Sequence, residues 1–300
     1  MQHKTSSRST GTHSAFDPRL LGDVKAIPIV LERALNDLAT TDAEARFVRQ
    51  VCDVTDRLNS GRYWSYQPND LRYHDYQHTL QAAWAYLDLV AGLRLAEPDP
   101  APLTPREAAL GFAAIMLHDT GYLKTKGDDT GIGAKYTQCH VLRSCALAAS
   151  ILPTFGCVKP EVDDIIGAIR CTGLSGNPAA ANFGSEHART IACMVATADY
   201  LGQMAAPEYP DKLPSLFDEF AEADEFNGVP IAQRQFTSLA QLLAATPAFW
   251  AKFVQPKLER DFGGVHRFMR AARPDAPNPY FTAIEENLAI LARRHPAGAA

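Results

Sequence analysis

Apolar residues recur every three or four positions in nearly every segment between the proline and glycine residues of this 300-residue chain. This spacing places them on one face of an α-helix, whereas the strict alternation that is typical of strands is almost absent. The pattern therefore predicts an all-α fold, a bundle of many helices that bury their apolar faces against one another. The expected helices cover residues 23–39, 42–59, 76–94, 105–118, 134–152, 160–171, 186–206, 212–225, 232–245, 247–262 and 279–294.

Two of these helices begin with recognisable capping residues. Thr104 followed by Pro105 is typical of an N-cap with a proline in the first turn. Asp75 stands directly before the helix expected at residue 76, where its side chain can accept a hydrogen bond from the first turn. These signals fix the starts of two helices that carry candidate chemistry.

The chain is expected to form one domain. The Pro-rich stretch 96–105 and the loop 173–185 connect helices, and neither has the character of a domain boundary. Residues 1–18 are polar and predict a disordered tail. We therefore expect a single helical domain over residues 19–296.

The composition argues against two classes of protein. Hydrophobic residues make up 46% of the chain, but no apolar run approaches the length of a membrane span, so no membrane partner is expected. The formal net charge of -5 argues against a nucleic-acid scaffold, because binding a phosphate backbone requires clustered Lys and Arg residues. A small anionic substrate is compatible with this charge where a metal ion supplies positive charge. The sequence predicts no particular oligomeric state.

The cysteines point to a reducing compartment. They are scattered without CxxC pairs, in a chain long enough to fold without disulfide bonds. We expect reduced, mostly packed thiols and a cytoplasmic location. The six residues are Cys52, Cys139, Cys145, Cys157, Cys171 and Cys193.

Histidine and aspartate residues stand out in four segments of the central part of the chain. The segments read YHDYQH at 73–78, LHDTGY at 117–122, YTQCHVLRSCALAASIL at 136–152 and MVATADYLGQM at 194–204. All four lie in or beside expected helices. The candidate groups that they contribute are His74, His78, His118, Asp119, His140 and Asp199.

Their residue types predict a metal site. Asp119 and Asp199 are embedded in hydrophobic sequence, and a buried carboxylate is costly unless it is paired or binds a metal. His74 and His78 are about one helical turn apart and can face the same side. Metal sites combine neutral imidazoles and carboxylates that converge from different elements. The alternative for His118 and Asp119 is a plain helix C-terminus, and for Asp199 a cap or an ion pair with a nearby arginine.

The ordered combination of His78, His118–Asp119 and Asp199 resembles the HD-domain superfamily of metal-dependent phosphohydrolases. The resemblance covers residues 73–204, followed by C-terminal helices at 205–296. It implies an all-α HD-domain bundle in which His78, His118, Asp119 and Asp199 bind a divalent metal. It further implies hydrolysis of a phosphate ester or anhydride in a nucleotide or another small phosphorylated metabolite.

The segment YHDYQHT also resembles the YHN-x-x-H-A segment of cyclic-nucleotide phosphodiesterases. That resemblance implies His74 as the general acid and His78 as a metal ligand. The segment FWAKFVQP at 249–256 is similar to the later F-x-x-x-x-V-x-P segment of the same family. The glutamine that contacts the purine there falls on Thr246 in this chain, so the sequence does not predict cyclic-nucleotide specificity.

Binuclear HD hydrolases have two further histidines after the HD pair. His140 matches the first, and Cys171 stands where the second is expected. A thiolate can bind zinc but is an unusual ligand for magnesium or manganese. We therefore predict one divalent metal site (Mg, Mn, Zn or Fe), with His140 as a metal or phosphate contact, and leave a second ion open.

The resemblance implies a mechanism in which the metal activates water and His74 protonates the leaving oxygen. A bound cation lowers the pKa of water from about 15.7 toward neutrality, and histidine exchanges protons near physiological pH. Asp119 is expected to coordinate the metal and to orient the attacking water. From their positions after the motifs, Arg143, Lys124 and Lys126 are candidate contacts to the substrate phosphate.

Two other functions are compatible with the same residues. One is an HD-type di-iron oxygenase, which needs more ligands and is disfavoured by Cys171. The other is a degenerate HD fold that serves as a regulatory binding module, which the intact motif disfavours.

The remaining polar and aromatic candidates have simpler interpretations. The acidic stretch 218–226 is expected to be a solvated helix face, and His187, His266 and His295 are assigned to the surface. Aromatic residues of the C-terminal helices are able to stack on a base, but at helical spacing they more often belong to the core. These are Tyr209, Phe226, Phe249 and Trp250.

Overall fold

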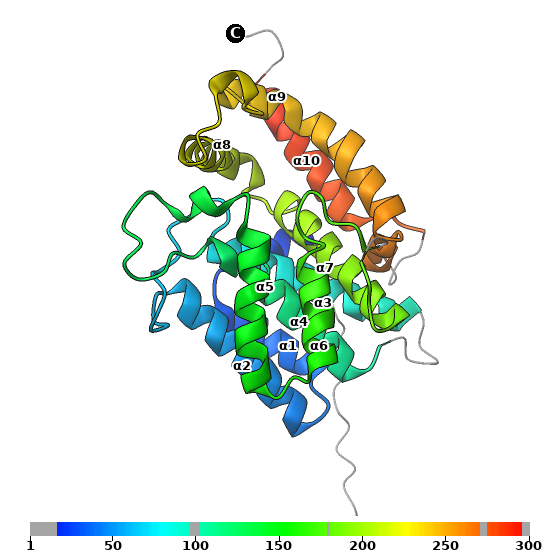
Figure 1. Cartoon of the computed structure of the whole chain (residues 1–300). Coiled ribbons are helices and arrows are strands. Elements are labelled where there is room, and N and C mark those ends of the chain that lie inside the picture. Colours follow the sequence, from blue (N-terminus) through cyan, green and yellow to red (C-terminus); the bar gives the residue numbers. More distant parts are fainter. Residues whose placement is uncertain (1–16, 97–102, 179–180, 271–274, 296–300) are drawn as a thin grey trace, which may run out of the picture.

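The computed structural model describes residues 17–96, 103–178, 181–270 and 275–295. The predicted all-α fold is confirmed, because this part of the chain consists of helices and connecting turns with one isolated β-bridge between Tyr66 and Thr125 (Figure 1). Its α-helices are α1 (Ile27–Leu38), α2 (Asp42–Asn59), α3 (Tyr76–Ala96), α4 (Pro105–Leu117), α5 (His140–Ile151), α6 (Lys159–Ile169), α7 (Glu186–Met204), α8 (Tyr209–Phe226), α9 (Leu239–Phe249) and α10 (Pro279–Arg294).

Two stretches differ from the expected helices. The helix predicted at 134–152 is divided into the 3-10 helix η3 (Gly133–Tyr136) and α5, because Lys135 turns inward and donates to the backbone carbonyl of Thr130 at 2.6 Å. In the C-terminal part, α9 runs through Pro247 and continues as π-helical turns over 250–254 and 257–261. The predicted break at this position is therefore wrong, although a proline removes one hydrogen bond and crowds the preceding turn, and α9 begins at Leu239 instead of at the predicted 232.

The expected N-terminal tail lies mostly outside the described residues. Its last two positions, Asp17 and Pro18, begin the 3-10 helix η1 (Pro18–Asp23), and the Asp17 side chain accepts from the backbone N–H of Arg19 at 3.0 Å. The cap predicted at Thr104 is confirmed as a capping box with Glu107. No helix in the described part of the chain combines the length and the hydrophobicity that a membrane span needs.

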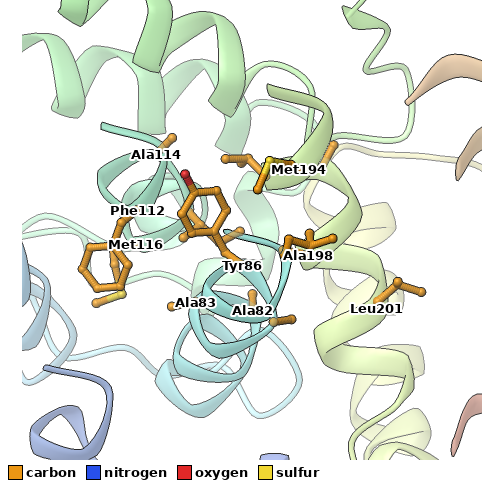
Figure 2. Close-up of a cluster of buried hydrophobic side chains, with 14 of the residues drawn as sticks. Ala82, Ala83, Tyr86, Phe112, Ala114, Met116, Met194, Ala198 and Leu201 are labelled. Atoms are coloured by element: carbon orange, nitrogen blue, oxygen red, sulfur yellow. The ribbon is translucent and has the colours of Figure 1, made fainter. Parts of the chain in front are cut away.

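The centre of the molecule is formed where α3, α4 and α7 pack together. Small side chains on α3 and α7 let these helices approach closely, and larger side chains from all three fill the space around them. At Gly202 a Cβ atom would lie 2.8 Å from the Cα atom of Ala82, so only glycine fits between the two backbones. The packed residues labelled in Figure 2 are Ala82, Ala83, Tyr86, Phe112, Ala114, Met116, Met194, Ala198 and Leu201.

A hydroxyl group ties the start of α5 to the end of α4. Ser144 Oγ donates to the backbone carbonyl of His118 and accepts from the backbone N–H of Gly121 at 2.8 Å. A Cβ atom on Gly121 would lie 1.8 Å from the backbone oxygen of His140, so this contact requires glycine. The segment that carries the HD pair is therefore fixed against α5.

A buried ion pair attaches α10 and α1 to α3. Asp88 is 3% exposed, and its carboxylate accepts hydrogen bonds from Arg33 at 2.6 Å and from the Tyr280 hydroxyl at 2.6 Å.

All six cysteines are free thiols, and only Cys139 is exposed.

Replacing Gly202 by alanine is expected to destabilise the protein, although alanine is the better helix former. The added Cβ atom would meet backbone atoms of α3, so the expected loss is about 1–3 kcal/mol in the free energy of unfolding, measured by urea denaturation. Gly167→Ala in α6 is the matched control, because there the new Cβ atom would meet the rotatable ring of Phe183 at 2.7 Å. Equal losses in both variants would contradict the close approach of α3 and α7.

Candidate metal centre

Three helices bring four candidate side chains together in the core. His78 lies in the first turn of α3, where its backbone N–H donates to Asp75 Oδ1 at 2.8 Å, so the predicted cap is confirmed. His118 and Asp119 directly follow the last residue of α4, and Asp199 lies within α7. We call His78, His118, Asp119 and Asp199 the metal group.

The ligand atoms of the metal group are spaced as they would be around one cation. Nε2 of His78 is 3.4 Å from Oδ2 of Asp119 and 3.2 Å from Oδ1 of Asp199. Nε2 of His118 is 3.3 Å and 3.4 Å from the same two oxygens. Two ligands each about 2.1 Å from an ion lie about 3.0–3.4 Å apart at octahedral or tetrahedral angles. Within the described ranges, His78, His118 and Asp119 form the one set of metal-ligating residues whose ligand atoms all lie within 4.8 Å of one another; Asp199 is outside this set, although its Oδ1 lies close to both imidazoles.

Most of these ligand atoms have no hydrogen-bond partner. Nδ1 of His118 donates to the backbone carbonyl of Ile115 at 2.6 Å, which leaves a lone pair on Nε2. Nε2 of His118, both ring nitrogens of His78 and Oδ2 of Asp119 are buried and unpartnered. A buried polar atom without a partner costs about 1–3 kcal/mol, and more where it is charged. A divalent cation would satisfy Nε2 of both histidines and Oδ2 of Asp119, so these residues fit a metal ion, whereas Nδ1 of His78 would stay without a partner.

Burial and mutual attraction oppose each other in the metal group. Burial lowers the pKa of His118, but Asp119 and Asp199 together raise it well above its ordinary value. Burial raises the pKa of Asp199, but attraction to His118 and His78 outweighs this and lowers the pKa to about 2. The pKa of Asp119 is likewise held well below its ordinary value by the imidazoles, despite burial. Both carboxylates are therefore ionised, as metal ligands must be.

His74 and His140 lie on the side of the metal group that is open to solvent. Their side chains are 18% and 17% exposed, whereas the imidazoles of the metal group are 2% exposed or less. Nε2 of His140 is 3.8 Å from Oδ1 of Asp119. The ring of Tyr122 stacks between the two histidines, with centroid distances of 4.8 Å to His74 and 4.2 Å to His140. This side gives access to the metal group.

Glu219 in α8 completes the site, and the sequence interpretation missed it. The acidic stretch was expected to be solvated, but Glu219 is 2% exposed. Its Oε2 lies 2.7 Å from Nδ1 of His74. Its Oε1 accepts from the backbone N–H groups of Arg72 at 3.0 Å and Tyr73 at 2.7 Å. The carboxylate therefore fixes both the backbone before α3 and the orientation of the His74 ring.

The spacing of apolar residues along α8 could have predicted that Glu219 is buried. Glu219 lies three positions after Leu216 and four before Ala223, and both of those side chains face the core. An acidic residue in register with an apolar face is buried and requires a partner, whatever the charge of its neighbours.

The three predicted phosphate contacts lie in or near the loop that follows the HD pair. Arg143 donates two hydrogen bonds to backbone carbonyls, at 2.6 Å and 2.8 Å. Lys124 donates to a backbone carbonyl at 2.7 Å and pairs with Asp70 at 3.0 Å. Lys126 is exposed. Two of these three positively charged side chains thus already bind groups within the protein. A contact between any of the three and a substrate stays a prediction.

Cys171 is not among the close ligand atoms. It is 1% exposed, and burial raises the pKa of its thiol to about 12. A thiol is a metal ligand only as the thiolate, so this residue is poorly suited to the position where binuclear HD proteins have a histidine.

His266 differs from its expected position on the surface. It is 8% exposed, its ring stacks on Phe281 of α10, and its Nε2 lies 3.2 Å from Glu259. The local sequence around His266 does not show that α10 covers this side chain. His187 and His295 are exposed, as expected.

The aromatic residues considered for base stacking lie in different environments. Tyr209 and Trp250 are buried in the core, Phe249 is half-buried and Phe226 is exposed. Thr246, which stands where phosphodiesterases have the purine-contacting glutamine, is buried, and its hydroxyl donates to a backbone carbonyl of the preceding turn at 2.9 Å.

Comparison with known proteins shows the fold. No protein-family model and no curated protein sequence matches this chain. The structure of LmjPDEB1 in complex with IBMX is similar, with a TM-score of 0.56 and 14% sequence identity over 96% of both chains. At this identity the similarity shows the fold alone: the chain has an all-helical fold like that of the LmjPDEB1 structure.

Mn²⁺ or Zn²⁺ is expected to raise the melting temperature of the metal-depleted protein, because an ion would pair with buried atoms that have no partner. At 100 times the dissociation constant the stabilisation is about 2.7 kcal/mol. Differential scanning fluorimetry measures the shift, which His118→Ala should abolish and which His187→Ala, at an exposed histidine, should retain. A melting temperature that responds to no divalent cation would contradict the metal centre.

Proposed function

We propose that this chain is a metal-dependent phosphohydrolase that cleaves a phosphate ester or anhydride of a nucleotide or another small phosphorylated metabolite. The observation that carries the proposal is the convergence of unpartnered imidazole nitrogens and ionised carboxylates beside a partly exposed histidine. The HD-like fold supports the proposal independently of the side chains.

The metal group would hold the cation. His78 and His118 would supply Nε2, while Asp119 and Asp199 would supply carboxylate oxygens. A divalent cation at this position withdraws charge from phosphoryl oxygens and makes hydroxide available near neutral pH. Oδ1 of Asp119 lies 3.8 Å from Nε2 of the partly exposed His140, so this oxygen could orient the attacking water.

His74 would donate the proton to the leaving oxygen. The Glu219 carboxylate can only accept, so the Nδ1 proton of His74 is directed toward Glu219, and Nε2 is the atom left to exchange a proton with the substrate. The 18% exposure of the His74 side chain lets a leaving group reach it.

The substrate class is set by charge rather than by a base-specific contact. Thr246 uses its hydroxyl hydrogen within its own helix and has no amide to contact a purine. Half-buried Phe249 leaves an aromatic surface on the same helix. This combination favours a phosphorylated substrate with an apolar or aromatic portion, without selection for one base.

The two alternative functions differ in metal content. An HD-type di-iron oxygenase would purify with two irons per chain and an iron absorption band, whereas a degenerate regulatory module would bind no metal. Metal analysis of the purified protein therefore separates the regulatory module from the two enzymes, and iron content together with the absorption band identifies the oxygenase.

A panel of phosphomonoesters, cyclic and linear nucleotides and phosphoanhydrides, assayed with Mg²⁺, Mn²⁺, Zn²⁺ and Fe²⁺, tests the proposal directly. Released phosphate or alcohol is the readout. Full activity and full metal content in both His118→Ala and Asp119→Ala would exclude the metal group as the active site.

His74→Gln is expected to lower kcat by about 10²- to 10⁴-fold for a phosphoester with an alkyl leaving group. The loss should be far smaller for a p-nitrophenyl ester, because p-nitrophenolate departs without being protonated. Metal content should not change. Equal losses with the two esters would show that His74 is not the general acid.

Glu219→Gln is expected to lower kcat for the alkyl ester by about 10- to 100-fold, because an amide replaces the carboxylate that accepts from Nδ1 and orients the His74 ring, while the shape is kept. Steady-state kinetics measures the change. Glu222→Gln is the matched control on the same helix, since Glu222 binds the backbone N–H of Ile132 at 2.9 Å instead of a histidine. Similar losses in both variants would indicate a general effect on α8.

A further inference from the structure

Polar contacts, most of them partly buried, link Asp199 to His74 by way of the side chain and the backbone of Tyr73. Nε2 of Gln203 donates to Oδ1 of Asp199 at 3.3 Å, and the Tyr73 hydroxyl donates to Oε1 of Gln203 at 2.6 Å. The backbone N–H of Tyr73 donates to Glu219 at 2.7 Å, and the same carboxylate lies 2.7 Å from Nδ1 of His74. The metal group and the proposed acid are therefore connected through Tyr73 and Gln203.

The direction of each hydrogen bond follows from the groups involved. Asp199 is an ionised carboxylate and can only accept, so it requires the NH₂ end of Gln203. The oxygen end of the amide then faces Tyr73, whose hydroxyl must donate. The arrangement has one consistent set of donors and acceptors, which holds Oδ1 of Asp199 toward the two imidazoles of the metal group.

The position of the two residues supports this role. Gln203 lies one helical turn after Asp199 on α7 and also donates to its backbone carbonyl at 3.2 Å. Tyr73 is 5% exposed, and the edge of its ring contacts His74 at a centroid distance of 4.9 Å. Tyr73, Gln203 and His78 line one small cavity, so the pair lies directly behind the metal group.

We propose that Tyr73 and Gln203 are positioning residues: they orient Asp199 for metal binding and couple it to His74. This inference rests on the proposed metal-dependent function and assigns a role to residues outside the HD motif. Without the Gln203 amide, the Asp199 carboxylate is free to rotate away from the imidazoles. Without the Tyr73 hydroxyl, the amide loses the contact that fixes its orientation.

A double-mutant cycle on the full-length, metal-depleted chain tests the inference. The dissociation constant for Mn²⁺ is measured by isothermal titration calorimetry for wild type, Tyr73→Phe, Gln203→Leu and the double variant. Each single change is expected to weaken binding about 10-fold or more. The double variant should bind no more weakly than Gln203→Leu, because the Tyr73 hydroxyl acts only through the amide.

Two controls separate orientation of Asp199 from loss of structure. Gln77→Leu removes an amide of the same kind from α3, one residue before His78, but Gln77 donates to Glu208 at 2.7 Å and contacts no metal ligand, so Mn²⁺ affinity should be unchanged. Tyr73→Phe removes a single oxygen atom, and its metal-free melting curve, followed by circular dichroism, should show a folded protein.

Each outcome bears on a different claim. Unchanged Mn²⁺ affinity in Tyr73→Phe and Gln203→Leu overturns the positioning role and leaves the proposed function intact. Additive losses in the double variant, or an equal loss in Gln77→Leu, overturn the coupling between the two residues. A wild-type chain that binds no Mn²⁺ overturns the metal-dependent function and this inference together.

Discussion

Two ionised carboxylates buried beside two imidazoles are the constraint on which the rest of the structure depends. Asp119 and Asp199 are excluded from water, and charges in such surroundings are costly unless they are compensated. Protonated imidazoles offer partial compensation in the metal-free protein, but several buried nitrogen and oxygen atoms are left without a hydrogen bond. A divalent cation compensates both carboxylates at once and leaves the imidazoles neutral, which is the form in which they act as ligands.

Close helix packing is what allows so small a centre to be formed from distant parts of the chain. Gly202 lets α7 approach α3, and Gly121 lets α5 approach the segment that carries the HD pair. The imidazole of His118 is fixed from behind by a backbone carbonyl of its own helix, so its orientation needs no other side chain. Stability at these contacts and geometry at the centre therefore depend on the same residues, and a side chain added at either glycine would disturb both.

The sequence predicted most of the fold because helical periodicity and capping residues are local signals. It also predicted the members of the metal group, which the structure brings together, because aspartates within apolar helices stand out without any knowledge of their partners. It could not predict that Glu219 turns inward or that α10 covers His266, since both depend on packing between distant segments. Arg143 was considered for phosphate binding because of its position after the motif, yet its donors are directed to backbone carbonyls that only the folded loop presents.

The charges around the partly exposed side of the metal group, where His74 and His140 lie, explain why the proposed reaction would need a cation. Arg143 and Lys124 hold the loop after the HD pair, and the side chains that border the entrance are imidazole and phenol rings of His74, His140 and Tyr122. A phosphate that enters beside ionised Asp119 would be repelled by it. A divalent ion in the metal group would cancel the charge of the two carboxylates, so binding of the anionic substrate and its chemistry would both begin with the same ion. This coupling distinguishes the site from phosphate pockets that rely on arginine and lysine, which bind their anion whether or not a metal is present.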